Sequence, residues 1–145
     1  MDNRARARQW MEDNWNRRRA DVVGELLHPE AVGHMEGGTI HGVEEFLEAR
    51  TGLLTAFPDL AIEVEACIAD GDDVAVRWVL SGTHMADAFG IPASGRTFRA
   101  RGTTWFQFRD GMVVGGADTW NQGGVLASLK DGTSYASHGL APLHG

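Results

Sequence analysis

The spacing of apolar residues changes near residue 60, and this change constrains the fold more than any other feature of the 145-residue chain. Before that point apolar side chains recur every three or four residues, as on one face of a helix. After it they alternate with polar ones, as in half-buried strands. Helices followed by an antiparallel sheet predict an α+β domain. A strongly curled sheet closed by helices would leave a deep pocket, where a small molecule can bind.

The first half of the chain predicts three helices and one hairpin. In the first helix Ala7, Trp10, Met11, Asn14 and Trp15 form the inward stripe. The predicted helices span residues 3–18, 20–27 and 43–56, and the strand or hairpin spans 31–41 with Gly37-Gly38 as its turn. Pro29 lies just past the second helix and Pro58 closes the third, as expected of helix-stopping residues.

The second half predicts four strands, at residues 60–69, 73–84, 96–109 and 112–121, and a final short helix around Val125 and Leu129. In the first of these strands the inward residues are expected to be Ile62, Val64, Ala66 and Ile68. We expect residues 1–130 to form a single domain. Residues 131–145 are rich in Gly, Ser and His, and are expected to be a flexible tail.

Charge and cysteine content narrow the class of protein. The net charge of −7 argues against nucleic acid and against anionic membrane surfaces as partners, because both are bound through clustered Lys and Arg. A single cysteine, Cys67, excludes an internal disulfide. The first ten residues lack the apolar core of a signal peptide, and no apolar run reaches the roughly 18 residues of a membrane helix. We therefore expect a cytoplasmic protein.

Asp118 is the strongest candidate for chemistry. Strand alternation places it on one face with Val114, Gly116 and Trp120. The neighbouring strand has an apolar face made of Phe98, Ala100, Gly102, Thr104, Phe106 and Phe108. If both faces line one cavity, burial raises the pKa of Asp118 toward that of a general base. Two other interpretations remain: Asp118 is solvent-exposed, or it pairs with Arg101 across the sheet.

Two histidines are candidates to assist Asp118 in catalysis. His84 ends the strand 73–84 and could shuttle a proton or donate to an oxyanion, although a lone histidine is more often structural. His34 would be oriented with Val32 and Glu36 by strand alternation. The His, Glu and Asp residues show no recognised metal-ligand spacing, so no metal site is expected.

Five tryptophans supply large flat surfaces that can stack on a ligand. Trp15, Trp78 and Trp120 are the candidates for the pocket, whereas Trp10 and Trp105 are assigned to core packing. No nucleophile elbow, phosphate-binding loop or dinucleotide-binding motif is present. Cys67 has no evident histidine partner, which argues against thiol chemistry.

The motifs DNW at 13–15, LLHPE at 26–30, IHG at 40–42 and AFPDL at 56–60 occur in order along the chain. GTH and FGIPASGR at 82–96, RDGMVV at 109–114 and DTWNQGGVL at 118–126 follow. With these motifs, residues 4–129 resemble the SnoaL-like polyketide cyclases, also called ester cyclases, of the nuclear transport factor 2-like superfamily. The resemblance implies a cone-shaped α+β barrel, a homodimer packed through its sheet, and chemistry without a metal or cofactor.

The resemblance also implies a mechanism. The best-known cyclases close a ring by intramolecular aldol condensation, and Asp118 matches their catalytic aspartate. Gly102 and Thr104 stand where those enzymes place Gln and His, and Gly33 stands where they place Asn. We therefore expect Asp118 to work with other helpers, namely Thr104, His34 and His84. The expected substrate contacts are Trp15, Trp78, Gly102, Phe106 and Trp120.

Three functions follow from these patterns. The first is an enzyme that removes a proton from a hydrophobic polyketide-type carbonyl compound. The second is a non-catalytic binding or accessory protein, for example in polyketide hydroxylation, that uses the same cone. The third is another reaction of this superfamily. Its epoxide hydrolases use paired aspartates bridged by arginine, and a second pocket aspartate beside Arg99 or Arg101 is absent from the predicted strands. For its ketosteroid isomerases, which place their base elsewhere in the cone, we find no clear match.

Overall fold

The computed structural model describes residues 1–132 of the chain. Its helical elements are α1 (Asn3–Met11), the π-helix η1 (Glu12–Asn16), α2 (Asp21–Leu26), α3 (Gly42–Ala56) and α4 (Gln122–Asp131). Its strands are β1 (Leu27–Met35), β2 (Gly38–His41), β3 (Ala61–Asp70), β4 (Asp73–Thr83), β5 (Thr97–Arg109) and β6 (Met112–Trp120). Most elements lie within a few residues of their predicted positions, but the predicted hairpin is longer because β1 begins at Leu27.

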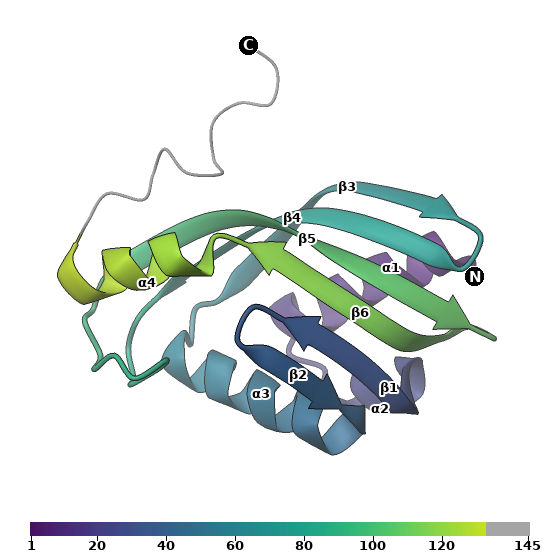
Figure 1. Cartoon of the computed structure of the whole chain (residues 1–145), viewed down its shortest axis with the longest axis horizontal. Helices are drawn as coiled ribbons and strands as arrows, with labels where there is room; N and C mark the ends of the chain where they lie inside the picture. The colour runs from purple at the N-terminus through teal and green to yellow at the C-terminus, as the bar shows by residue number, and fades with distance from the viewer. Residues whose placement is uncertain (133–145) are drawn as a thin grey trace, which may run out of the picture.

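The strands form one curled sheet in the order β2-β1-β6-β5-β4-β3, shown in Figure 1. All neighbours are antiparallel except β1 and β6, which run parallel. Helix α1 packs against β3 and β4, whereas α3 packs against β1 and β2. The two helices meet where the Trp10 and Phe46 rings lie 4.9 Å apart, so together they cover the inner face of the sheet. The expected α+β cone is therefore confirmed.

Two β-bulges move side chains to faces that simple alternation does not predict. In β3 the register shifts between Val64 and Ala66, so Cys67 turns inward and Ile68 is 69% exposed, contrary to the predicted pattern. In β6 the register shifts opposite Gln107 and Phe108, so Val113 rather than Val114 is buried with the apolar face. One extra residue in a strand reverses every side chain on one side of the bulge.

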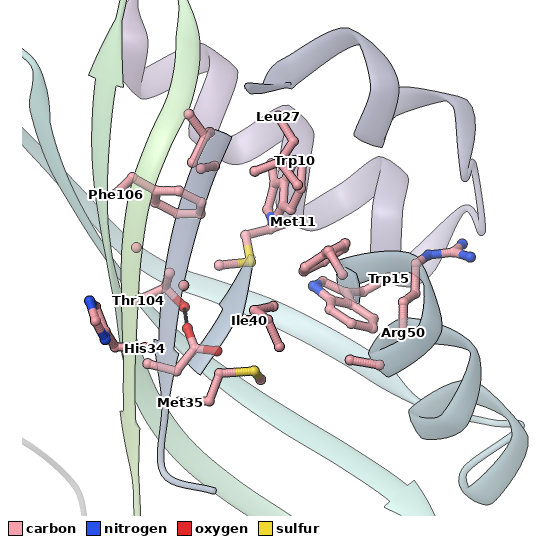
Figure 2. Close-up of a pocket in the computed structure, with 18 of the residues that line it drawn as sticks. Trp10, Met11, Trp15, Leu27, His34, Met35, Ile40, Arg50, Thr104 and Phe106 are labelled. Carbon is pink, nitrogen blue, oxygen red and sulfur yellow. Dashed lines mark hydrogen bonds between the residues drawn. The ribbon is translucent and has the colours of Figure 1, made fainter. Parts of the chain in front are cut away.

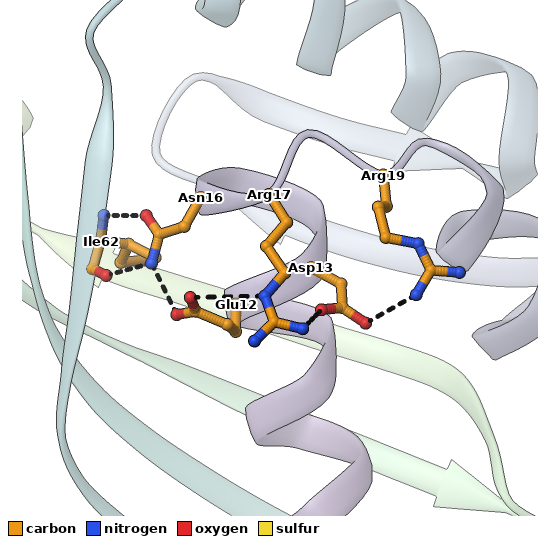
Figure 3. A network of polar contacts seen from close by, with 6 residues as sticks. All are labelled: Glu12, Asp13, Asn16, Arg17, Arg19 and Ile62. Carbon is orange, nitrogen blue, oxygen red and sulfur yellow. Dashed lines mark hydrogen bonds and ion pairs between the residues drawn. The ribbon is translucent and has the colours of Figure 1, made fainter.

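The predicted helix 3–18 is two elements, because the chain widens into a π-helix at η1. Figure 3 shows how its end is tied to the sheet: the Asn16 amide exchanges two 2.8 Å hydrogen bonds with the backbone of Ile62. Asp13 is 5% exposed and lies 3.5 Å from both Arg17 and Arg19. Isolated π turns often occur at functional sites, and this one carries Trp15.

Helix α4 confirms the predicted final helix. The flexible tail predicted for 131–145 lies outside the described residues, apart from Asp131, which ends α4, and Gly132. Trp105, assigned to core packing from sequence, is instead 51% exposed on the outer face, where its indole bonds Asp73 at 3.0 Å. Within residues 1–132, no helix is long and apolar enough to cross a bilayer.

Candidate active site

A cavity of about 150 Å³ lies between the inner face of the sheet and the helices α1, η1 and α3. Its lining is mainly apolar and includes Trp10, Met11, Trp15, Phe46, Leu53, Trp78, Leu80, Phe106, Val113 and Trp120. Met35 and Ala49, which also line it, are exposed and mark its open side. An apolar cavity of about this volume holds one benzene ring, so a polycyclic ligand would extend through the opening.

Asp118 lies on the inner face of β6 and lines this cavity. Thr104 is its direct neighbour on β5 in the strand register. The Thr104 hydroxyl donates a 2.6 Å hydrogen bond to Asp118 Oδ1, drawn as the dashed line from Thr104 in Figure 2. Asp118 is thus neither fully exposed nor paired with Arg101, whose guanidinium instead bonds Glu65 at 2.7 Å.

Trp78 fixes the direction of the Thr104 hydroxyl. Its indole N–H donates to Thr104 Oγ1 at 2.9 Å. An indole nitrogen can only donate, so Thr104 must accept from Trp78, and its single proton is directed to Asp118. Thr104, expected from sequence as a helper of Asp118, therefore bonds the Asp118 carboxylate itself and holds it in position.

Two opposing effects set the acidity of Asp118. Burial raises its pKa above the usual aspartate value, because an ionised carboxylate loses hydration in an apolar cavity. The Thr104 hydrogen bond lowers the pKa, since it stabilises the ionised form, but burial is the larger effect. The result is a carboxylate that is more basic than one in water yet held in one orientation.

His84 is not brought to the cavity, contrary to its predicted role. Its side chain is fully buried beyond the cavity wall, with the ring centroid 5.6 Å from that of Phe57. Its Nδ1 accepts from the Ser94 backbone N–H at 3.3 Å and lies 2.9 Å from Ser94 Oγ. His84 therefore anchors the loop between β4 and β5 and does not contact Asp118.

His34 contributes to the lining of the cavity, but its ring is turned away from Thr104. Its partner in the β1–β6 register is Ala117, the neighbour of Asp118, whose side chain points to the opposite face. Figure 2 shows the His34 ring on the side of the strands away from Thr104. Strand alternation correctly groups His34 with Val32, but both lie along the outer-face hollow that Trp105 and Gln107 also line.

Four of the five predicted substrate contacts line the cavity: Trp15, Trp78, Phe106 and Trp120. Gly102 does not line the cavity, because the Trp78 indole lies over it. A Cβ at Gly102 would approach Trp78 Cζ2 and the Thr119 carbonyl oxygen to 2.8 Å. Glycine is needed here so that Trp78 can lie flat on β5 and reach Thr104.

Arg50, which the sequence patterns did not single out, is a buried cation in the cavity lining. Its side chain on α3 is 8% exposed and donates to Asn14, from Nε to Oδ1 at 2.6 Å and from Nη2 to the backbone oxygen at 3.1 Å. Burial, and secondarily the charge of Arg18, lower its pKa. The helical spacing could have indicated this burial, because residue 50 lies four residues from both Phe46 and Leu54, which share the inward face of the predicted helix 43–56.

The sequence profile of the SnoaL-like polyketide cyclases matches residues 5–129. The chain belongs to this family. Its overall shape agrees with a SnoaL-like protein from Jannaschia sp. CCS1, with a TM-score of 0.82, 22% identity, and coverage of 88% of this chain and 90% of that one. No curated protein sequence matches the chain.

Two Streptomyces proteins are similar in both sequence and structure. IdmH of S. antibioticus, a proposed polyketide cyclase, is 28% identical, with a TM-score of 0.75 over 86% of this chain and 96% of that one. AclR of S. galilaeus, a proposed hydroxylase, is 27% identical, with the same TM-score over 86% of this chain and 92% of that one. A SnoaL-like cone thus occurs in proteins assigned to different reactions, so the site must decide between functions.

Proposed function

We propose that this SnoaL-like protein is a cofactor-free enzyme that removes a proton from carbon beside a carbonyl group, with Asp118 as the general base. The observation that carries the proposal is a carboxylate in an apolar cavity, held by Thr104 and made more basic by burial. The apolar lining favours a hydrophobic, polyketide-type substrate with flat rings. General bases work best with a pKa near the operating pH, which burial helps to supply.

The proposed reaction balances without an added reagent. Asp118 takes the proton from the acidic carbon, and the electron pair of that C–H bond moves to the carbonyl oxygen to form an enolate. In an aldol cyclisation the enolate carbon attacks a second carbonyl of the same molecule. Protonated Asp118 then returns its proton to the new alkoxide, which regenerates the carboxylate.

Hydrogen–deuterium exchange tests this proposal. Native protein and Asp118→Asn are incubated in deuterated water with a panel of hydrophobic carbon acids, such as aromatic 1,3-ketoesters and the methyl ester of anthraquinone-2-acetic acid. NMR follows loss of the acidic C–H signal. We expect acceleration by the native protein and its loss in the variant. Bound compounds that exchange no faster than in buffer would contradict the proposal.

One observation favours a second candidate, a binding or accessory role. Within residues 1–132, His34 is the one histidine in the cavity lining and its ring is turned away from Thr104, no glutamine lines the cavity, and AclR shows that a relative can be assigned outside cyclisation. Under this role Asp118 anchors a ligand hydroxyl. Asp118→Asn would then weaken ligand affinity modestly, and no product would form with any ligand.

We also propose a homodimer formed through the outer face of the sheet. The strand registers align Ile68, Ala75, Trp105 and Ala117 in one row across four strands. Ile68 is 69% exposed and Trp105 is 51% exposed. Exposed apolar patches of this kind are typical of interaction surfaces. Sedimentation analysis should give a dimer that Trp105→Glu converts to monomer, and a monomeric native protein would contradict this assembly.

A further inference from the structure

Most polar side chains of the cavity already form hydrogen bonds within the protein. The Trp78 indole N–H is used by Thr104, and the Thr104 hydroxyl is used by Asp118. Arg50 donates to Asn14, and Figure 2 shows its guanidinium on the far side of Trp15 from Thr104. An enolate formed beside Asp118 needs a hydrogen-bond donor, because an uncompensated oxyanion in an apolar cavity is costly.

Three indole N–H groups remain to supply that donor. Trp10, Trp15 and Trp120 line the cavity, and no residue of 1–132 accepts a hydrogen bond from their indole nitrogens. None of the three nitrogens is sealed from solvent. Trp10 is only 5% exposed as a residue. Buried indoles usually find a partner, as Trp78 does here.

Trp15 lies in a stretch of backbone whose neighbouring residues on both sides are fixed by hydrogen bonds. Asn14, its neighbour in η1, receives two hydrogen bonds from Arg50, and Asn16 is bonded twice to Ile62 on β3. The Phe46 ring packs edge-on at 6.1 Å. Figure 2 shows the nitrogen-bearing edge of Trp15 turned toward the Thr104 side of the cavity. Preorganised donors stabilise a developing charge without the cost of reorganisation.

We propose that the Trp15 indole N–H is the donor to the carbonyl oxygen that becomes the enolate. The inference rests on the proposed function of Asp118. As Asp118 takes the proton, negative charge gathers on the oxygen that faces Trp15, and the N–H hydrogen bond strengthens. Trp10 and Trp120 offer further hydrogen-bond donors, whereas Asp118 is the one strong acceptor among the side chains that line the cavity. We therefore expect a ligand that is rich in acceptor oxygens.

NMR of the indole groups tests the hydrogen bond apart from any activity. Protein labelled with ¹⁵N in its tryptophan rings gives one indole signal for each of its five tryptophans, assigned through single Trp→Phe variants. The methyl ester of anthraquinone-2-acetic acid is then added, with binding followed by tryptophan fluorescence. We expect the Trp15 N–H proton to move downfield. The signals of Trp78 and Trp105, already bonded within the protein, should move much less.

The exchange rate tests the catalytic role. Trp15→Phe keeps an aromatic ring but removes the N–H together with the pyrrole part of the indole, and loss of one oxyanion donor costs about 10²-fold in rate. We expect a loss of that size, with circular dichroism unchanged. Trp105→Phe is the matched control, because it removes an indole N–H on the outer face and should exchange at the native rate.

Each outcome separates this inference from the proposed function. Native exchange that Trp15→Phe retains within twofold, or a bound probe that leaves the Trp15 signal unmoved, overturns the role of Trp15 while Asp118 remains the base. A downfield shift without exchange keeps the hydrogen bond and overturns the reaction. If Trp15→Phe fails to fold, the indole shift in the native protein decides alone. If no compound of the panel binds, both proposals are contradicted.

Discussion

Thr104 and Asp118 face each other across β5 and β6, joined by a 2.6 Å hydrogen bond whose direction is set by the Trp78 indole behind Thr104. This three-residue chain connects the core of the sheet to the cavity. It fixes which oxygen of Asp118 is occupied and leaves the other for a substrate proton.

Thr104 should control the pH at which Asp118 acts. Thr104→Val removes a hydrogen bond that favours the carboxylate, so the pKa of Asp118 rises further and activity moves to higher pH. Thr104→Ser keeps the hydroxyl and should keep the native profile. The pH dependence of substrate exchange measures both variants. Identical profiles for Val and Ser would show that the hydroxyl does not act on Asp118.

Asp118→Asn should stabilise the protein at neutral pH. The pKa of Asp118 is raised in the folded state, so the folded protein binds the Asp118 proton more tightly than the unfolded chain does. The native protein therefore loses stability as pH rises from about 4, the usual pKa in the unfolded chain, through the raised pKa. A tenfold weaker acid in the folded state corresponds to about 1.4 kcal/mol of lost unfolding free energy at pH values above the raised pKa. Denaturation should therefore find the variant more stable than native at pH 7 and nearly equal below pH ~4. A variant less stable than native at pH 7 would argue against a costly buried carboxylate.

Gly102→Ala should destabilise the fold by about 1–3 kcal/mol, as overpacking does. The new methyl would press on the Trp78 ring and the Thr119 carbonyl oxygen, and it would loosen the Trp78–Thr104 contact. Gly52→Ala is the matched control, because Gly52 lies within α3 with open space around it. At this position alanine should raise the free energy of unfolding by about 0.5–1 kcal/mol. Chemical denaturation of both variants checks the opposite signs.

His84→Phe should lower stability and spare catalysis. Phenylalanine can keep the ring contact with Phe57 but leaves the Ser94 N–H without its acceptor, at a cost of about 1–3 kcal/mol. The variant's exchange rate, measured well below its melting temperature, should keep the native pH profile. A loss of rate with an unchanged melting temperature would restore His84 as a functional residue.

The order and type of the elements could be predicted from sequence because the apolar periods are strong and the turns are marked by Gly, Pro and Asp. The inner face of β5 follows simple alternation from Phe98 to Phe108, and the structure confirms it. Together with the face of β6 that carries Asp118, this apolar face predicts that Asp118 lies in a pocket. The position of Asp118 in the cavity agrees with that expectation.

Other features depend on insertions or on contacts between distant segments. The bulges that expose Ile68 and turn Val114 outward are single extra residues with no signal in the alternation. The orientation of His34 follows from its pairing with β6, and the burial of His84 depends on Ser94 in the next loop. Arg50 lies on the face of α3 where periodicity predicts apolar residues, and its burial depends on its hydrogen bonds to Asn14, which is 36 residues away in the chain.

The most direct test of the account compares two pKa values. The first is the apparent pKa of proton–deuterium exchange catalysed by the native protein, read from its rate against pH. The second is the pKa of the Asp118 carboxyl, followed by ¹³C NMR and assigned through its absence in Asp118→Asn. The account predicts that the two agree, that both lie above the usual aspartate value of about 3.9, and that the variant lacks the pH-dependent limb. A rate that titrates independently of the Asp118 signal, or that persists in the variant, would contradict Asp118 as the base.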